Sequence, residues 1–332
     1  MSTKNFVITL CGGPVCADEG VRALQEAFEK ELARRKLTGE VAIQSSGCLG
    51  LHTQSPAVAV SPYFTVYGKV KPADVAEIVE QHIVKGQPVS RLAVKEDHLF
   101  NRSFSVLGDG GCFSRQLRIV LRNCGVIDPE SIDDYLSVRG YEALAKVLTE
   151  MTPEQVVAEV KKSGLRGLGG AGFSTGIKWE LTAAEKNDEK FVICNADEGD
   201  PGAFMDRSTV EGDPHSVMEG MIIGGYAVGA TKGFVYIRAE YPLAIQRLKK
   251  AIADARREGF LGPNILGTSF SFDIEIRLGA GAFVCGEETA LIHSIEGHRG
   301  MPRPRPPYPS VQGLFDKPTL INNVETLANI PV

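Results

Sequence analysis

Apolar side chains recur with strand-like and helix-like periods along residues 1–90. Alternating apolar runs predict strands, and apolar positions three and four residues apart predict helices. The expected order is a strand at 5–10, a helix at 18–35, a strand at 40–46, a β-rich stretch at 57–70 and a helix at 72–86. We therefore expect a small α/β domain over residues 1–90.

A strong helix signal lies further along the chain, at residues 152–164. Thr152 stands at the N-cap, a proline takes the first helical position, and Gln155 completes a capping box. Gly164 follows the last helical residue and ends the helix.

Residues 91–150 contain turn signals followed by two short amphipathic helices. This segment is expected to connect the first domain to a larger one at 151–332. The larger domain is also predicted to hold a helix at 174–186, a strand at 191–194, and a strand, glycine loop and helix in succession at 272–297.

Composition and charge narrow the class of protein. The chain has 332 residues, 43% hydrophobic and 23% charged, as expected for a soluble globular protein of two or three domains. Its net charge of −5 argues against nucleic-acid binding. The start of the chain lacks the apolar core of a secretory signal, and the most apolar window, residues 217–230, is short and interrupted. We expect a cytoplasmic protein without direct membrane insertion, whose seven cysteines are thiols or metal ligands.

Six glycines fall within residues 164–178. Such a run is costly in backbone entropy, so it predicts a loop that a ligand approaches closely. Gly167, Gly169 and Gly172 satisfy the dinucleotide-binding spacing G-x-G-x-x-G, but that fingerprint must follow a strand. Here it follows a helix, so an ordinary Rossmann dehydrogenase with an organic substrate is rejected.

Two more loops carry candidate binding groups. One follows the strand at 191–194 and contains Asn195, Asp197, Glu198 and Asp200. These polar residues are candidate ligands, and the alternative is a turn whose acids are solvated. The second glycine loop leads into a helix near Glu287, whose free N–H groups favour an anionic or polar ligand. A pair of asparagines at 322 and 323 precedes another helical start and could serve as N-caps. Together the loops indicate a large flat ligand with a phosphate.

Four potential metal ligands occur in the first domain, in loops after predicted strands. Cys11 and Cys16 form C-x4-C, and Cys48 and His52 form C-x3-H. The pattern resembles the thioredoxin-like 2Fe-2S ferredoxin domain over residues 1–90, with His52 where that family has its fourth cysteine. Imidazole can replace thiolate on one iron, so a Cys3His 2Fe-2S cluster is expected. The alternative is a scaffold domain that has lost the cluster.

The larger domain resembles a known flavoprotein family in four motifs, in order and spacing. They are RGLGGAGFSTGIKW, ICNADEGDPG, GAGAFVCGEETAL and INNVETLA. The resemblance is to the FMN- and NADH-binding subunit of respiratory complex I and its relatives in NAD-linked hydrogenases and formate dehydrogenases. It covers about residues 100–332 and implies a Rossmann-like α/β domain. With the N-terminal ferredoxin domain, it matches the diaphorase subunits of soluble, often electron-bifurcating, enzymes.

The resemblance also implies the binding residues. FMN would contact Gly167, Gly169, Lys178, Asn195, Asp197, Glu198, Gly286, Glu287, Asn322, Asn323 and Thr326. NADH would contact Phe173, Asp200, Glu288, Arg305 and Tyr308. Glu288 is the only one of these considered for a catalytic role. An acidic pocket predicts NAD(H) in preference to NADP(H).

The chain departs from the family at several points. Leu168 stands where Arg is usual, Ser174 where Pro is usual, and Asp200 where Glu is frequent. Family members continue into a helical domain with a 4Fe-4S cluster, whereas this sequence stops at Val332. Either the sequence is a fragment, or another subunit accepts the electrons.

The expected activity is hydride transfer from NADH to FMN, followed by single-electron transfer to iron–sulfur clusters of a multisubunit complex. Implied partners are a small thioredoxin-like 2Fe-2S subunit and a large iron–sulfur catalytic subunit of a hydrogenase or formate dehydrogenase. The rival hypothesis is a non-catalytic electron-transfer or assembly subunit with a degenerate site.

Overall fold

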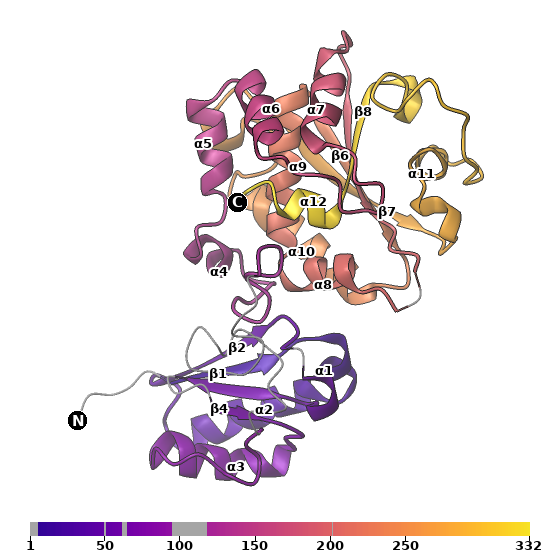
Figure 1. Ribbon diagram of the computed structural model, residues 1–332. Helices are drawn as coiled ribbons and strands as arrows, with labels where there is room; N and C mark the ends of the chain where they lie inside the picture. The colour runs from indigo at the N-terminus through magenta and orange to yellow at the C-terminus, as the bar shows by residue number, and fades with distance from the viewer. Residues whose placement is uncertain (1–5, 50, 62–64, 95–117, 201) are drawn as a thin grey trace. The chain divides into compact units, whose positions relative to one another are not determined.

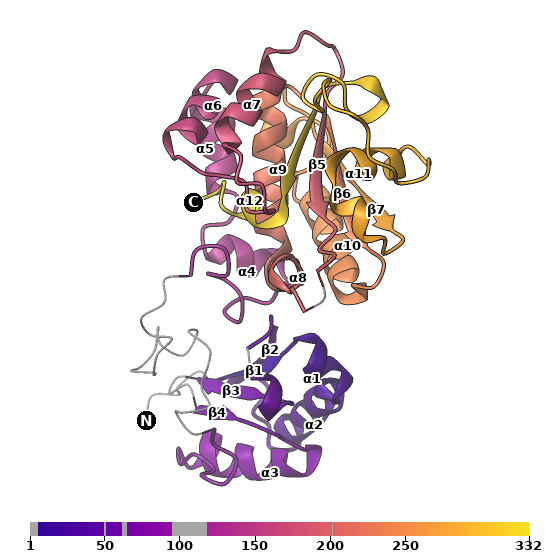
Figure 2. The same cartoon turned by 45° about the vertical axis from the view of Figure 1, so that its right-hand side comes forward.

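The computed structural model describes residues 6–49, 51–61, 65–94, 118–200 and 202–332, without the side chains of Pro14 and His52. Contacts divide the chain into two compact units, Met1–Pro129 and Glu130–Val332. In both views the colour runs along the chain, so the elements of the first unit are indigo to purple and those of the second run from magenta to yellow (Figures 1 and 2). Each has its own sheet and its own core, and each is described separately.

The first unit is a four-stranded mixed sheet with helices. Its elements are β1 (Phe6–Cys11), α1 (Pro14–Asp18), α2 (Val21–Arg34), β2 (Val41–Ser46), β3 (Val58–Ser61), β4 (Thr65–Tyr67), α3 (Val75–Ile78) and a π-helical turn, Val79–Val84. The strand order is β2-β1-β3-β4, with β1 parallel to β2 and antiparallel to β3. The predicted α/β pattern is confirmed, although the helix expected at 18–35 begins later. Gly20, with φ of 96°, separates it from the short helix α1.

The second unit is a parallel sheet covered by helices. Its elements are α4 (Ile132–Ser137), α5 (Glu142–Glu150), α6 (Pro153–Lys162), α7 (Thr175–Ala184), β5 (Phe191–Ala196), α8 (Met205–Gly212), α9 (Pro214–Val228), β6 (Lys232–Arg238), α10 (Pro242–Arg257), β7 (Asp273–Gly279), α11 (Glu288–Ile295), β8 (Thr319–Asn323) and α12 (Val324–Ala328). The strand order is β7-β6-β5-β8, and every neighbouring pair is parallel. This confirms the predicted Rossmann-like class.

Helices α7 and α9 lie on one face of this sheet and α11 on the other (Figures 1 and 2). On the α11 side, Phe191, Ile193 and Phe234 pack against Leu291. On the other side, every residue of α9 except Tyr226 is buried, as in a helix covered all round by protein. Helix α9 includes most of the apolar window at 217–230. In the described residues, no helix is long and apolar enough to cross a membrane.

The end of the segment predicted as a connection packs within the second unit. The carboxylate of Glu219 on α9 accepts hydrogen bonds from the Tyr135 hydroxyl at 2.6 Å and from the N–H groups of Tyr141 at 2.9 Å and Leu144 at 3.0 Å. All its partners belong to α4, α5 or the turn between them. This buried carboxylate fastens that helical pair to α9.

Candidate functional site

The predicted binding motifs meet at the carboxyl edge of the parallel sheet. Strands β5 and β8 are neighbours, and their register pairs Cys194 with Asn322 and Asn195 with Asn323. Parallel strands end at a common edge, so the loops that follow them converge. The acidic loop and the paired asparagines therefore lie side by side.

The first glycine loop packs against the end of β8. The N–H of Leu168 donates to Oγ1 of Thr326 at 2.9 Å. A Cβ on Gly169 would lie 3.0 Å from Cβ of Asn323, a tight contact that glycine avoids. At Gly167 a Cβ would meet only backbone atoms, the nearest at 3.6 Å, and at Gly170 it would meet nothing within 4 Å. At Gly167 and Gly170 the backbone of the loop is therefore not covered by side chains and is open to a ligand.

The second glycine loop meets the acidic loop. Its Phe283–Gly286 turn lies between β7 and α11. Nδ2 of Asn195 donates to the carbonyl of Gly286 at 2.9 Å, and a Cβ on Gly286 would lie 3.3 Å from the Asp197 carbonyl oxygen. All three predicted loops, and the paired asparagines, are therefore brought together.

Lys178 links the first helix after the glycine loop to this edge. Its Nζ donates to the Ile321 carbonyl at 3.1 Å and lies 3.4 Å from Oε1 of Glu288. One predicted FMN residue thus pairs with one predicted NADH residue. The ammonium group brings a positive charge to an edge that is rich in carboxylates.

Two buried carboxyl groups dominate the electrostatics. Burial raises the pKa of Asp197 to about 6, although Arg238 lies 3.7 Å away and opposes this shift. Neither carboxyl oxygen of Asp197 has a hydrogen-bond partner in the described part of the chain. Burial likewise raises the pKa of Asp206 to about 7, with its Oδ2 accepting from Nδ2 of Asn323 at 2.7 Å. Both groups can hold a proton near neutral pH.

Sequence reasoning missed Arg238 and Asp206. Arg238 ends β6, and Asp206 lies in the first turn of α8, shortly after the acidic loop. For Asp206 the available sequence signal was its position shortly after the acidic loop. For Arg238 there was none, because it ends a strand that the sequence did not predict and lies far along the chain from every predicted ligand. Their roles depend on burial and on partners distant in sequence.

Several predicted ligand side chains stabilise the protein itself. Both oxygens of Glu198 accept from the first N–H groups of α8, at 2.7 to 3.3 Å. Glu287 is the N-cap of α11, and Asn323 is the N-cap of α12. Oδ1 of Asn322 accepts from Nε1 of Trp179 at 3.0 Å. These side chains fix the helix starts that face the site.

The predicted NADH residues are more open to solvent. Phe173 is 49% exposed and Tyr308 is 58% exposed, while Asp200 is exposed and Glu288 is half-buried. Arg305 lies 3.5 Å from Oε1 of Glu287, which brings it to the second glycine loop. The two aromatic rings are therefore available to a ligand that binds from outside.

Two departures from the family pattern have defined places. Leu168 is 40% exposed, so an apolar side chain of the first glycine loop faces solvent. Ser174 is the N-cap of α7, and its side chain accepts from the N–H of Ile177. Serine thus retains a helix-starting role at this position.

The three predicted cysteine ligands of the first unit converge. The Cys11 thiol is within hydrogen-bond reach of Cys16 and Cys48. The Cys16 contact lowers the pKa of Cys11, but the Cys48 contact and burial outweigh it and raise that pKa to about 11. None of the three forms a disulfide. The side chain of His52 lies outside the described residues, so its predicted role stays a prediction.

Among the described side chains, no group of three or more His, Cys, Asp or Glu is arranged to hold a metal ion. That finding concerns single ions. In a 2Fe-2S cluster the four ligands are divided between two irons and need not converge on one point. Three neighbouring thiols, two of them, Cys11 and Cys16, in an apolar surrounding, fit the soft-ligand chemistry of such a cluster.

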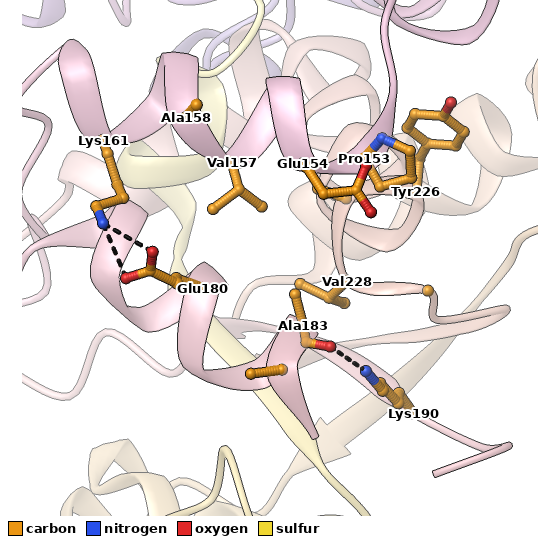
Figure 3. Close-up of a pocket in the computed structure, with 13 residues that line it drawn as sticks. Pro153, Glu154, Val157, Ala158, Lys161, Glu180, Ala183, Lys190, Tyr226 and Val228 are labelled. Atoms are coloured by element: carbon orange, nitrogen blue, oxygen red, sulfur yellow. Dashed lines mark hydrogen bonds and ion pairs between the residues drawn. The ribbon is translucent and has the colours of Figure 1, made fainter. Parts of the chain in front are cut away.

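A separate cavity of about 730 Å³ lies between α6, α7 and the end of α9 (Figure 3). Val157, Val228 and Ala183 form part of its wall, and a 2.8 Å ion pair joins Lys161 to Glu180. It also reaches Lys190, directly before β5, and is therefore at the amino end of that strand. In the described part of the chain, no predicted site residue lines it.

Comparison with known proteins identifies the class. Residues 160–332 match the family model of the Nuo51 FMN-binding domain, and residues 2–82 match that of the thioredoxin-like [2Fe-2S] ferredoxin. The first match covers more than half of the chain, which therefore belongs to the Nuo51 FMN-binding domain family. The predicted resemblance is confirmed.

Individual relatives include subunits of hydrogenases and of NADH-quinone oxidoreductases. NADP-reducing hydrogenase subunit HndC of Solidesulfovibrio fructosivorans is 69% identical over 65% of this chain and 44% of that protein. An NADH-quinone oxidoreductase subunit of Rhizobium meliloti (strain 1021) is 51% identical over 64% of this chain and 51% of that protein. The NAD-reducing hydrogenase HoxS subunit alpha of Cupriavidus necator is 37% identical over 98% of this chain and 52% of that protein.

Among solved structures, an NAD+-reducing [NiFe]-hydrogenase in the H2-reduced state aligns with 98% of this chain and 52% of its own chain. The identity is 31% and the TM-score 0.55. The chain thus spans about half the length of the relatives that it matches.

The residues at the sheet edge fit FMN. The glycine loops expose backbone without side chains, and Lys178 supplies a cation. The N–H groups at the start of α11, expected to favour an anionic or polar ligand, are instead bonded by the Glu287 carboxylate, which accepts from Thr289 at 2.9 Å and from Ala290 at 3.0 Å. The Asp197 oxygens accept no hydrogen bond from the described residues, so they are buried acceptors for a polar ligand.

Proposed function

We propose that this chain is part of a diaphorase-type NADH:acceptor oxidoreductase subunit, with a ferredoxin domain at 1–90, a connection at 91–150 and an FMN- and NADH-binding domain at 151–332. The observation that supports it is the meeting of the glycine loops, the acidic loop and the paired asparagines at one sheet edge. FMN held by these loops would supply hydride acceptance from NADH and the release of single electrons, chemistry that side chains do not supply.

The protein's share is binding, orientation and electrostatics. Gly167 and Gly169 let backbone approach the flavin, and Lys178 balances its negative charge. Asp197 is assigned to the FMN site as well, where its buried carboxyl, with a pKa raised to about 6, would be mostly ionised at pH 7 and would take up a proton in mildly acidic solution. Further FMN contacts are assigned to Asn195, Glu198, Gly286, Glu287, Asn322, Asn323 and Thr326.

The exposed residues are assigned to the nicotinamide cofactor. The rings of Phe173 and Tyr308 offer stacking surfaces, Arg305 offers a cation, and the carboxylates of Asp200 and Glu288 accept hydrogen bonds from ribose hydroxyls. Carboxylates repel the extra phosphate of NADPH, so we propose a preference for NAD(H). The names of the relatives give different nicotinamide cofactors: one is named for NADP and others for NAD or NADH.

The partners and location are also part of this proposal. We assign a small thioredoxin-like 2Fe-2S subunit and a large iron–sulfur catalytic subunit of a hydrogenase or formate dehydrogenase as partners, in the cytoplasm. Electron bifurcation and transfer to a 4Fe-4S centre belong to the same proposal.

One observation favours a second candidate, a non-catalytic electron-transfer subunit. Leu168 presents an exposed apolar side chain where the family usually has a cation. Without that cation, flavin or nicotinamide binding would be weaker.

The deciding experiment is the visible spectrum of the anaerobically purified, FMN-reconstituted chain before and after NADH. We expect a flavin band that NADH bleaches and NADPH does not. Bleaching by dithionite alone would favour the non-catalytic candidate, and equal bleaching by NADPH would contradict the proposed preference. L168R is the matched variant, because restoring the cation should strengthen a weak response.

A further inference from the structure

A serine hydroxyl lies against one of the predicted cluster ligands. Oγ of Ser55 is 2.8 Å from Sγ of Cys16. Ser55 is 7% exposed and Cys16 is 2% exposed, so water does not compete strongly for this contact. Ser55 directly follows the His52–Gln54 turn, which carries the predicted fourth ligand. The hydroxyl therefore belongs to the immediate surroundings of the predicted 2Fe-2S cluster.

The direction of this hydrogen bond follows from the chemistry of the ligand. Between a neutral thiol and a hydroxyl, either group can donate the hydrogen bond. A cysteine that ligates iron is a thiolate and has no proton, so the Ser55 O–H must donate to sulfur. The N–H of Leu49 makes a comparable contact to Sγ of Cys11, at 3.4 Å. The Ser55 donor is shorter and belongs to a side chain, so substitution can remove it.

We propose that Ser55 is a positioning residue that sets the reduction potential of the 2Fe-2S cluster through the Cys16 thiolate. The inference rests on the proposed cluster in this domain. Reduction adds negative charge to the cluster, and a hydrogen-bond donor at a ligand sulfur stabilises that charge. The Ser55 hydroxyl therefore favours the reduced cluster and raises its potential.

The test is a redox titration of the full chain, purified anaerobically and reconstituted with iron and sulfide. The reduced cluster is followed by electron paramagnetic resonance. S55A should have a more negative midpoint potential, so its reduced fraction falls several-fold at the potential that half-reduces the wild-type protein. S55T, which keeps a hydroxyl, should return toward the wild-type midpoint.

S46A is the matched control. Ser46 is also fully buried in this unit, but its hydroxyl donates to the carbonyls of Gly47, at 2.9 Å, and Leu10, at 3.4 Å. Removing it should leave the midpoint unchanged. A shift in S46A equal to that in S55A would overturn the assignment to Ser55.

The outcomes separate this inference from the cluster on which it rests. An intact S55A cluster with the wild-type midpoint overturns the role of Ser55 alone. If S55A assembles no cluster, the pair S55T and S55V decides, because the two side chains have the same shape and differ in the hydroxyl. Equal midpoints in that pair overturn the proposal, and a wild-type protein without a 2Fe-2S signal overturns the cluster as well.

Discussion

The side chains at the sheet edge differ in how they satisfy their polar atoms. Glu198 and Asn323 bond backbone N–H groups within the protein, so their loss would release a helix start as well as a ligand contact. Asp197 leaves its oxygens buried without described partners, and Asp206 leaves its Oδ1 in the same condition. Buried carboxyl oxygens without hydrogen-bond donors cost stability when ionised, and the Arg238 guanidinium, 3.7 Å from Oδ1 of Asp197, offsets only part of that cost. Titration of these carboxyls should therefore change the free energy of unfolding with pH, even in the protein without a cofactor.

Asp206 gives a pH-dependent prediction for the protein without FMN. Burial, with a smaller contribution from Glu198, raises its folded-state pKa from 3.8 to about 7. Folding therefore takes up a proton between about pH 4 and 7, and this group's contribution to the free energy of unfolding falls as the pH rises through that window. Between pH 5 and 8 the loss should be on the order of 2 kcal/mol. D206N keeps an acceptor for Asn323 but does not titrate. Its free energy of unfolding should therefore fall less than that of the wild-type protein between pH 5 and pH 8.

Urea unfolding of both proteins at pH 5 and pH 8 measures this difference. Asp197, whose pKa is also raised by burial, titrates in the same range in both proteins and cancels in the comparison. Equal losses in the wild-type protein and D206N would show that Asp206 is ionised at little cost in the folded state.

At the scale of elements, the glycine loop combines packing with an open surface. Gly169 packs against Asn323 of β8, and an added Cβ would force one of them to move. G169A should therefore destabilise the FMN-free protein by about 1–3 kcal/mol. At Gly167 an added Cβ makes only ordinary contacts, so G167A should change that stability by less than about 0.5 kcal/mol.

A measurement of FMN affinity then distinguishes a glycine needed for packing within the protein from one needed for contact with the flavin. If backbone at Gly167 approaches the flavin, G167A should weaken FMN binding about tenfold, or about 1.4 kcal/mol, despite normal stability. Fluorescence quenching on FMN titration measures the affinity, and urea unfolding measures the stability. Unchanged affinity in G167A would place the flavin away from this residue.

The elements also differ in how far sequence predicts them. The helix α6 was predictable with its cap, because Thr152, Gln155 and Gly164 act within one or two turns of it. Strands β6 and β8 were not among the predicted elements. β8 is short and runs straight into α12, and its identity depends on pairing with β5, which precedes it by more than a hundred residues. Asp206 was missed for the same kind of reason, since its partner Asn323 is distant in sequence.

At the scale of the whole molecule, each of the two units has an apolar core of its own among the described residues. The first unit buries Phe28, Leu24 and Ile8 around its mixed sheet, and the second buries Phe234 and Phe191 with the helices of its parallel sheet. The motifs that define the two domains could be predicted from local spacing. The assignment of residues 130–150 to the second unit could not, because it depends on the buried hydrogen bonds of Glu219.

These two cores predict two distinguishable unfolding events. The chain has one tryptophan, Trp179, and it is fully buried in the second unit, so its fluorescence reports that unit. F28A removes a fully buried ring from the first core and should cost that unit about 3–5 kcal/mol, moving a circular-dichroism transition to lower urea concentration. The tryptophan transition should stay in place, because Phe28 belongs to the other core. F234A is the matched change in the second core and should shift the tryptophan transition. A shift of that transition in F28A would mean that the two units unfold as one cooperative body.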